Sequence, residues 1–511
     1  MGCQGRGAAV TAKAIAVLGT GSDVGKSLIT AGICRMLRRQ GVRVAPFKAQ
    51  NMSLNSFVTP EGGEIGRAQA LQAEACGLPP HVDMNPILLK PETDSRSQVV
   101  LLGKAITKLE ASAYFDRRQE LWKVVQESYA RLAVRYDVIV IEGAGSAAEV
   151  NLAHRDLVNW PMVRFTDAKV VLTADIDRGG VFAQIIGTLE LLDPEDRGRV
   201  CGIVINKFRG DRRLFDDGIH FLESRTRIPV LGLVPFVRDL RLDQEDSLNS
   251  EQSRYIEFAA DLVNIAVIRT PHMSNFTDFN ALVAEADVAL RYISSPSEMK
   301  AADVVVLPGS KNTLDDLAYL RQEGFPAACG RHVSSKKELV GICGGYQMLG
   351  RSIRDPYNVE QGGSSAGLGF LDVVTELQQE KRIARVEAGD AGFPMRGPGI
   401  VRGYRIHMGA TRRLGGLPCF KIRSGEGSMC DGELEGTVTS DGLVWGTYIH
   451  GVFDESGFRR SWLNRIRERK GLPQLGQEVS ETVTACLSKE LDRWADHLAA
   501  HVNMELLLRN V

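Results

Sequence analysis

The residues best suited to hold phosphate groups lie near the start of the chain, in the run Gly19-Thr-Gly-Ser-Asp-Val-Gly-Lys-Ser27. The run follows an apolar segment and opens into a helix-like one, so successive backbone N–H groups and a helix start would form an anion cradle. A lysine can neutralise the outer phosphates, and the serine after it can bind Mg²⁺. We expect ATP binding by Gly21, Ser22, Asp23, Val24, Gly25, Lys26 and Ser27. Thr20 stands where the strict P-loop pattern has glycine, so a turn that merely packs is the alternative.

Polar residues also follow three later apolar segments. Open parallel sheets bind ligands at the carboxyl ends of their strands, where these residues would lie. Glu142 ends the segment VIVIE, and we expect it to hold Mg²⁺ together with Ser27. Asn206 and Lys207 are weaker candidates for contact with the nucleotide base. The substrate-side candidates in this region are Asp175, Asp177 and Arg178.

A possible nucleophile lies in the second half, in Gly341-Ile-Cys-Gly-Gly-Tyr-Gln347. This run predicts a sharp strand-to-helix turn that places the thiol of Cys343 at a helix N-terminus, where the thiolate is favoured. The backbone N–H groups of Gly344 and Gly309 would form the oxyanion hole. His450, at the end of a later apolar segment, is the expected base. An inert buried thiol and a structural histidine are the alternatives, but their joint appearance favours a catalytic pair.

The composition is that of an ordinary globular protein without a broad charge bias. The chain has 511 residues, 62 Lys+Arg against 63 Asp+Glu, and a net charge of −1. Balanced charge gives no sign of a nucleic-acid or membrane partner. The nine cysteines form no CxxC motif, so we expect a reducing, cytoplasmic location. Neither a membrane span nor a secretory signal is expected.

Alternating strand-like and helix-like segments predict two α/β domains. Strand-like segments within 14–236 are separated by helical ones, as in a parallel sheet covered on both faces. We expect a P-loop domain over 1–237, a polar linker over 238–262 and a second α/β domain over 263–470. Residues 471–511 are expected to form a helical tail.

Cys343 and His450 with their flanking residues resemble the class I glutamine amidotransferase domains. These usually carry Glu two positions after the histidine, where this chain has Val452. A backbone carbonyl or Asp454 is therefore expected to orient the His450 ring. The phosphate loop is similar to the longer loop of dethiobiotin-synthetase-like enzymes. The cobyric acid and cobyrinic acid a,c-diamide synthases join two such domains in this order.

Strings over nearly the whole chain resemble the cobyric acid synthases. They include KAQNMSLN, MNPILLKP, DIDRGG, NKFRGD and GYRIHMG, the last with Arg405 where the family usually has Glu. The resemblance implies ATP, Mg²⁺ and glutamine as reactants and adenosylcobyrinic acid a,c-diamide as the corrinoid substrate. Four peripheral carboxylates (b, d, e and g) would be amidated to give adenosylcobyric acid, in cobalamin biosynthesis. Gln50 and Asn51 lie in the string KAQNMSLN, and the resemblance adds them to the substrate-side candidates.

Two other functions remain open at this point. The a,c-diamide synthases use the same chemistry on fewer carboxylates, and the asparagine-rich KAQNMSLN string argues against them. A P-loop ATPase with a non-catalytic amidotransferase-like domain is the second alternative. The intact pair of Cys343 and His450 argues against that one.

Overall fold

The chain forms two compact units, each of which is described by itself. The computed structural model describes residues 12–91, 96–110, 117–242, 257–392, 399–425, 431–476 and 482–509. Unit 1 comprises Met1–Ser53, Glu64–Glu251 and Leu487–Val511, and unit 2 comprises Leu54–Gly63 and Gln252–Cys486. Of the expected linker, residues 243–256 lie outside the described residues. None of the described helices is both long and apolar enough to cross a membrane.

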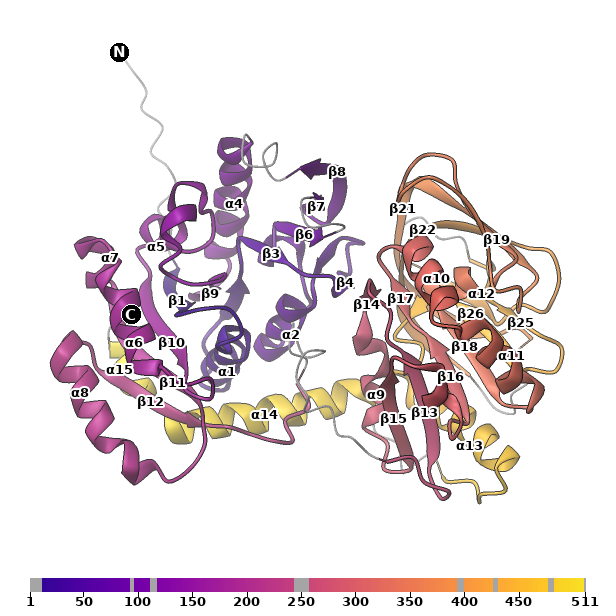
Figure 1. Cartoon of the computed structure of the whole chain (residues 1–511). Coiled ribbons are helices and arrows are strands. Elements are labelled where there is room, and N and C mark those ends of the chain that lie inside the picture. Colours follow the sequence, from indigo (N-terminus) through magenta and orange to yellow (C-terminus); the bar gives the residue numbers. More distant parts are fainter. Residues whose placement is uncertain are drawn as a thin grey trace, which may run out of the picture. The chain divides into compact units, whose positions relative to one another are not determined.

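Unit 1 is built on a six-stranded parallel sheet in the order β12-β11-β10-β1-β9-β2 (Figure 1). These strands were all expected as apolar segments, and they are nearly continuous runs of buried residues, as in sheets covered on both faces. The strands are β1 (Lys13–Gly19), β2 (Val44–Phe47), β9 (Val138–Glu142), β10 (Lys169–Asp175), β11 (Val200–Phe208) and β12 (Val230–Pro235).

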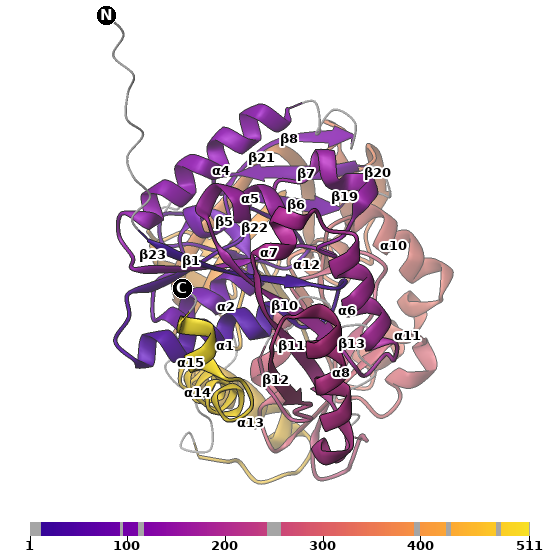
Figure 2. The ribbon, with the colours of Figure 1, turned by 90° about the vertical axis from the view of Figure 1, so that its left-hand side faces the viewer.

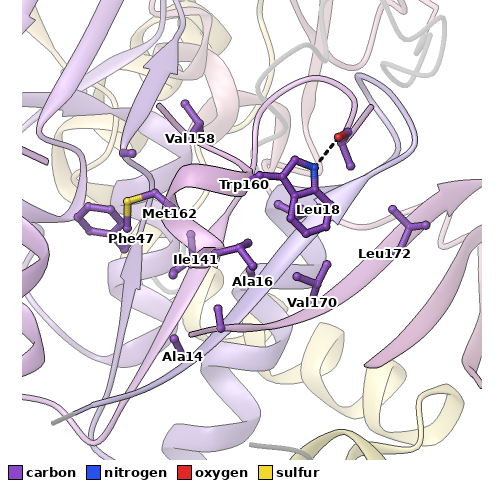
Figure 3. Close-up of a cluster of buried hydrophobic side chains, with 14 of the residues drawn as sticks. Ala14, Ala16, Leu18, Phe47, Ile141, Val158, Trp160, Met162, Val170 and Leu172 are labelled. Carbon is purple, nitrogen blue, oxygen red and sulfur yellow. Dashed lines mark hydrogen bonds between the residues drawn. The ribbon is translucent and has the colours of Figure 1, made fainter. Parts of the chain in front are cut away.

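One face of this sheet is covered by helices from the middle of the chain. Leu18, Ile141 and Leu172 of the strands pack there with Phe47 and Trp160 (Figure 3). The Trp160 indole N–H donates to the carbonyl of Ala147 at 2.7 Å, so this large ring is buried with its polar atom satisfied. The helices are α4 (Arg118–Ala133), α5 (Trp160–Thr166), α6 (Val181–Glu190), α7 (Pro194–Gly198) and α8 (Asp216–Thr226).

The other face carries α1 (Lys26–Arg39), α2 (Arg67–Cys76) and the C-terminal helices α14 (Val483–His501) and α15 (Met504–Arg509). Figure 2 shows α14 and α15 beside α1. The Trp494 indole of α14 donates to the Leu28 carbonyl at 2.7 Å, and Arg35 pairs with Asp492 at 2.8 Å. Residues from Leu487 onward therefore belong to unit 1, although the sequence suggested a separate tail.

A smaller sheet in unit 1 had no counterpart in the strands expected from sequence. It runs β3-β6-β7-β8, comprising β3 (Gln50–Met52), β6 (Ile87–Pro91), β7 (Arg96–Leu101) and β8 (Lys104–Glu110). Polar residues interrupt these short strands, so the pattern of apolar runs that revealed the main sheet does not apply to them. Its first strand carries Gln50 and Asn51.

Unit 2 contains a second, mostly parallel sheet in the order β15-β13-β16-β18-β26-β25, in which only the β25–β26 pair is antiparallel. Helices α10 (Thr313–Gln322), α11 (Phe325–Ser334), α12 (Gly344–Leu349) and α13 (Ser456–Arg469) belong to the same unit. The strands are β13 (Val263–Ile268), β15 (Val288–Ile293), β16 (Val304–Leu307), β18 (Glu338–Ile342), β25 (Thr437–Val438) and β26 (Val444–Thr447).

A further sheet in unit 2 places the strands over 373–390 and 401–413 beside the strand that ends at His450. Its path is β20-β19-β21-β22-β27, and off this path β23 pairs with β21 and β24 pairs with β23. The strands are β19 (Ser352–Asp355), β20 (Gly363–Ala366), β21 (Val373–Asp390), β22 (Val401–Arg413), β23 (Phe420–Gly425), β24 (Leu434–Glu435) and β27 (Ile449–His450). Because β22 pairs with β27, Tyr404 lies opposite His450.

Candidate active site

The predicted phosphate loop connects β1 to α1, as expected. Gly25 immediately precedes α1 with φ 97°, a left-handed backbone that disfavours side chains. A side chain there would also approach the amide nitrogen of Asn206 to 2.2 Å. The amine of Lys26 is 2.7 Å from the Gly21 carbonyl and 2.9 Å from that of Gly145. The amine is therefore held over the loop, where phosphates would lie.

Asn206 and Lys207 both contact the phosphate loop itself. The Asn206 amide donates to the Val24 carbonyl at 2.9 Å, and the Lys207 amine donates to the Asp23 carbonyl at 2.6 Å. The geometry thus gives both residues a part in holding the loop. Contact with a nucleotide base stays a prediction.

The structure brings Asp175 and Arg178 to the same loop. Lys207 pairs with Asp175 at 2.9 Å, and Arg178 pairs with Asp23 at 3.0 Å. Asp177 lies next to them and pairs with Arg209 at 2.7 Å. Three ion pairs therefore lie at or next to the phosphate loop. The substrate-side role of Asp175, Asp177 and Arg178 stays a prediction.

Ser27 and Glu142 meet, as a shared metal site requires. The Ser27 hydroxyl donates to Glu142 Oε1 at 2.7 Å, and the buried Lys48 amine lies 2.9 Å from the same oxygen. The second oxygen accepts from Gln72 at 2.5 Å. Burial raises the pKa of Glu142, but Lys48 and the hydrogen bonds outweigh it and hold that pKa below its usual value. A charged carboxylate beside a hydroxyl is an oxygen donor set that suits Mg²⁺.

Asn51 is linked to the Glu142 carboxylate through Gln69. Its neighbour on β3, Gln50, is half-buried. The Asn51 amide donates to Gln69 Oε1 at 3.0 Å, and the Gln69 amide donates to Glu142 Oε2 at 3.3 Å. Asn51 therefore orients groups around the proposed metal site. Its direct contact with substrate stays a prediction.

Cys343 occupies the strained turn that its sequence predicted. It lies between β18 and α12 with φ 51° and ψ −106°, and its thiol is at the start of the helix. Side chains are excluded at the next two positions, because a Cβ would lie 2.8 Å from Ser310 at Gly344 and 2.0 Å from the Leu307 carbonyl at Gly345. The packing therefore explains why two glycines follow Cys343.

His450 interacts with Cys343 and forms a buried ion pair with Asp278. The Nδ1 of His450 is 2.7 Å from Asp278 Oδ2, and both side chains are at most 2% exposed. Burial lowers the pKa of His450, but the charge and hydrogen bond of Asp278, helped by the Cys343 thiol, raise it to about 10. This arrangement favours a protonated imidazole beside the sulfur.

Asp278 is the acid that the sequence analysis missed. Its second oxygen accepts the Gly451 N–H at 2.9 Å, so the same carboxylate fixes both the ring and the backbone next to it. Sequence reasoning had pointed to a backbone carbonyl or to Asp454, four residues after the histidine. The structure instead supplies an acid 172 residues earlier in the chain, from the short 3-10 turn Phe276–Phe279.

The two predicted oxyanion residues lie next to Cys343 and His450. Gly344 is the first residue of α12, and Gly309 begins β17 (Gly309–Ser310), which pairs with β14 (Met273–Ser274). A Cβ at Gly309 would come within 3.3 Å of the His450 ring. Their use as oxyanion donors stays a prediction.

Arg405 is buried near this site on β22. Its guanidinium donates to Glu433 at 3.1 Å and lies 3.2 Å from the Nε2 atom of His407. Burial and then the Arg405 charge lower the pKa of His407 well below its usual value, so this histidine is neutral. The buried arginine that stands in place of the usual acid thus has a half-buried acidic partner, Glu433.

Comparison with known proteins agrees with this two-part layout. Residues 15–249 match the family described as CobQ/CobB/MinD/ParA nucleotide binding domain, and residues 264–458 match the CobB/CobQ-like glutamine amidotransferase domain. The cobyric acid synthase of Syntrophobacter fumaroxidans is 46% identical over 98% of both chains. That of Sorangium cellulosum is 47% identical over 98% of this chain and 99% of its own. Full-length similarity at this level, with both motifs intact, shows that the chain belongs to the cobyric acid synthase family.

Proposed function

We propose that the protein amidates the b, d, e and g carboxylates of adenosylcobyrinic acid a,c-diamide, using ATP, Mg²⁺ and glutamine. The observation that carries the proposal is that one chain holds a phosphate loop and a Cys343–His450–Asp278 set. The first suits activation of a carboxylate, and the second suits release of ammonia from glutamine. Together they make an amide ligase.

Activation is needed because a carboxylate has no good leaving group. A carboxylate oxygen of the substrate attacks the γ-phosphorus of ATP, the bond to ADP breaks, and an acyl phosphate forms. Lys26 and the loop N–H groups stabilise charge on the transferred phosphoryl group. Mg²⁺ at Ser27 and Glu142 would supply further neutralisation when bound. Ammonia then attacks the carbonyl carbon, and phosphate leaves.

Ammonia comes from the second set of residues. The Cys343 thiolate attacks the side-chain amide carbon of glutamine, and the His450 imidazolium gives its proton to the departing ammonia. A thioester remains, and His450 then accepts a proton from the attacking water, so that glutamate and free thiol are released. Asp278 holds the ring with Nε2 toward the sulfur throughout, since Nδ1 faces the carboxylate.

The test is mass spectrometry of the corrinoid after incubation with ATP, Mg²⁺ and glutamine. Each amidation replaces OH by NH₂, so intermediates should form a ladder of four equal mass steps that ends in the tetra-amidated product. A reaction that stops after one step would contradict the substrate assignment. No change in mass with either glutamine or ammonium would contradict the ligase assignment as a whole.

A further inference from the structure

A short segment that the sequence placed in the P-loop half packs beside the glutaminase residues. Leu54–Gly63 belongs to unit 2, although the residues before Leu54 and after Gly63 belong to unit 1. Ser56 and Val58 of its strand β4 (Ser56–Val58) are buried, and Val58 clusters with Tyr404 and Ile406. Phe57 meets the Tyr404 ring edge-on at 5.3 Å. The segment thus packs against β22.

The peptide groups of Ser56 hold two neighbours of the catalytic histidine. The Ser56 N–H donates to Oδ1 of Asn275 at 3.3 Å, and the Ser56 carbonyl accepts the Tyr404 hydroxyl at 3.2 Å. Tyr404 stacks on the His450 ring with a centroid distance of 5.3 Å. Asn275 lies against the same ring. Ser56 therefore restrains two side chains that contact His450.

The orientation of the Asn275 amide is fixed by this contact. A backbone N–H can only donate, so the atom facing Ser56 must be the oxygen, and the NH₂ group must face His450. That nitrogen lies 3.4 Å from Nδ1 and 3.2 Å from Nε2. In-plane approach at such similar distances would run into the carbon between the two ring nitrogens. The NH₂ group therefore lies over the ring face.

The positive end of an amide dipole over a ring opposes positive charge on that ring. Asn275 itself is buried and has a left-handed backbone with φ 53°, so its side chain is held in place at a strained position. Asp278, three residues on, acts in the opposite sense on the same ring. Among the described residues, other titratable groups near His450 include Cys343, Tyr404, His407 and, beside Gly451, Asp454.

We propose that Asn275 is a positioning residue that restrains the protonated form of His450, and that the Ser56 N–H sets this restraint by fixing the amide. Loss of the Ser56 contact would let the amide turn its oxygen to the ring, which favours the imidazolium form of His450. The inference rests on the proposed role of His450 and Cys343 in glutamine hydrolysis. Ser56 lies in a segment whose two ends continue into unit 1, so a part of the chain inserted between P-loop residues would influence His450.

The experiment is a pH titration of the His450 ring by NMR, with ¹³C-labelled histidine in the full-length protein. A Cys343→Ala background removes the thiol from beside the ring, so that only the ring responds to pH there. His450→Gln identifies the signal among the nine histidines. Asn275→Ala should raise the titration midpoint by about half to one pH unit, which is a three- to tenfold gain in imidazolium stability. Asn275→Asp should raise it further, because it adds a negative charge.

Ser56→Pro tests the backbone donor, because proline has no N–H. It should raise the midpoint at least as much as Asn275→Ala, whereas Ser56→Ala keeps the N–H and should retain the parent midpoint. If Ser56→Pro does not fold, the two Asn275 variants decide. Unchanged or lowered midpoints in both would overturn the inference. The titration uses no glutamine, so this failure is separate from that of the proposed function, which would appear as no glutamine hydrolysis by the parent protein.

Discussion

Replacing Asp278 by asparagine gives the sharpest test of the buried ion pair. Asparagine keeps the size of the side chain but has only one oxygen. The Gly451 N–H, which now donates to Asp278 at 2.9 Å, can only donate, so it would hold that oxygen. The new NH₂ group would then face Nδ1 of His450, at the position where the carboxylate oxygen lies 2.7 Å away. The ring would be forced to carry its proton on Nε2, toward the sulfur.

The magnitude follows from the burial of both partners, at most 2% exposed. Removing one member of such a pair costs about 3–5 kcal/mol. If this cost falls on the charged transition state, glutamine hydrolysis should slow about 10²- to 10⁴-fold. The assay is glutamate release in the complete reaction mixture. Amidation with ammonium should remain, because it uses only the acyl phosphate.

Asp454→Asn is the matched control, since Asp454 is the nearby acid that sequence alone suggested. It should leave glutamine hydrolysis within a few-fold of the parent. Near-parental hydrolysis by Asp278→Asn would refute the reasoning. So would an equal loss in both variants, because Asp278 would then have no special relation to the His450 ring.

Further predictions concern the phosphate loop, the C-terminal helix and pH. Lys26→Ala should abolish amidation with either glutamine or ammonium, measured by corrinoid mass; substantial ammonium-dependent product would rule out its role in phosphoryl transfer. Trp494→Ala should lower the free energy of unfolding by about 3–5 kcal/mol in denaturant titrations, with no selective loss of glutamine hydrolysis, because this buried ring packs on α1. Because the folded pKa of His450 is raised from 6.5 to about 10, its contribution to stability is complete below pH 6.5 and is lost as pH rises through 10. In Asp278→Asn, the part of the decline in unfolding free energy between pH 6.5 and 10 that is due to His450 should disappear. An unchanged dependence of unfolding free energy on pH would contradict the His450–Asp278 ion pair.

Much of the fold could be predicted from apolar runs. Most strands of the two six-stranded sheets are short runs of buried residues, so they were visible in the sequence as apolar segments. The two-residue strand β25 was not expected. The smaller sheet β3-β6-β7-β8 lacked that signal. The docking of α14 on α1 could not be predicted either, since a helical pattern gives one buried face but not its partner.

The site divides in the same way. Local motifs predicted the phosphate loop and the turn at Cys343, because strain and close packing demand glycines at fixed spacing there. Asp278 and Asn275 have no fixed spacing to His450, and only the folded chain brings them to it. Ser56 acts through its backbone N–H, which no residue type can reveal.

The central claim is that one unit activates carboxylates while the other releases ammonia, and Cys343→Ala tests it most directly. Without the sulfur no thioester can form, yet the phosphate loop still produces acyl phosphate. The variant, shown to be folded by circular dichroism, should yield no amidated corrinoid with glutamine. With ammonium it should yield product, and the yield should grow with pH as free ammonia increases. Full activity with glutamine, or no product with ammonium at any pH, would contradict the account.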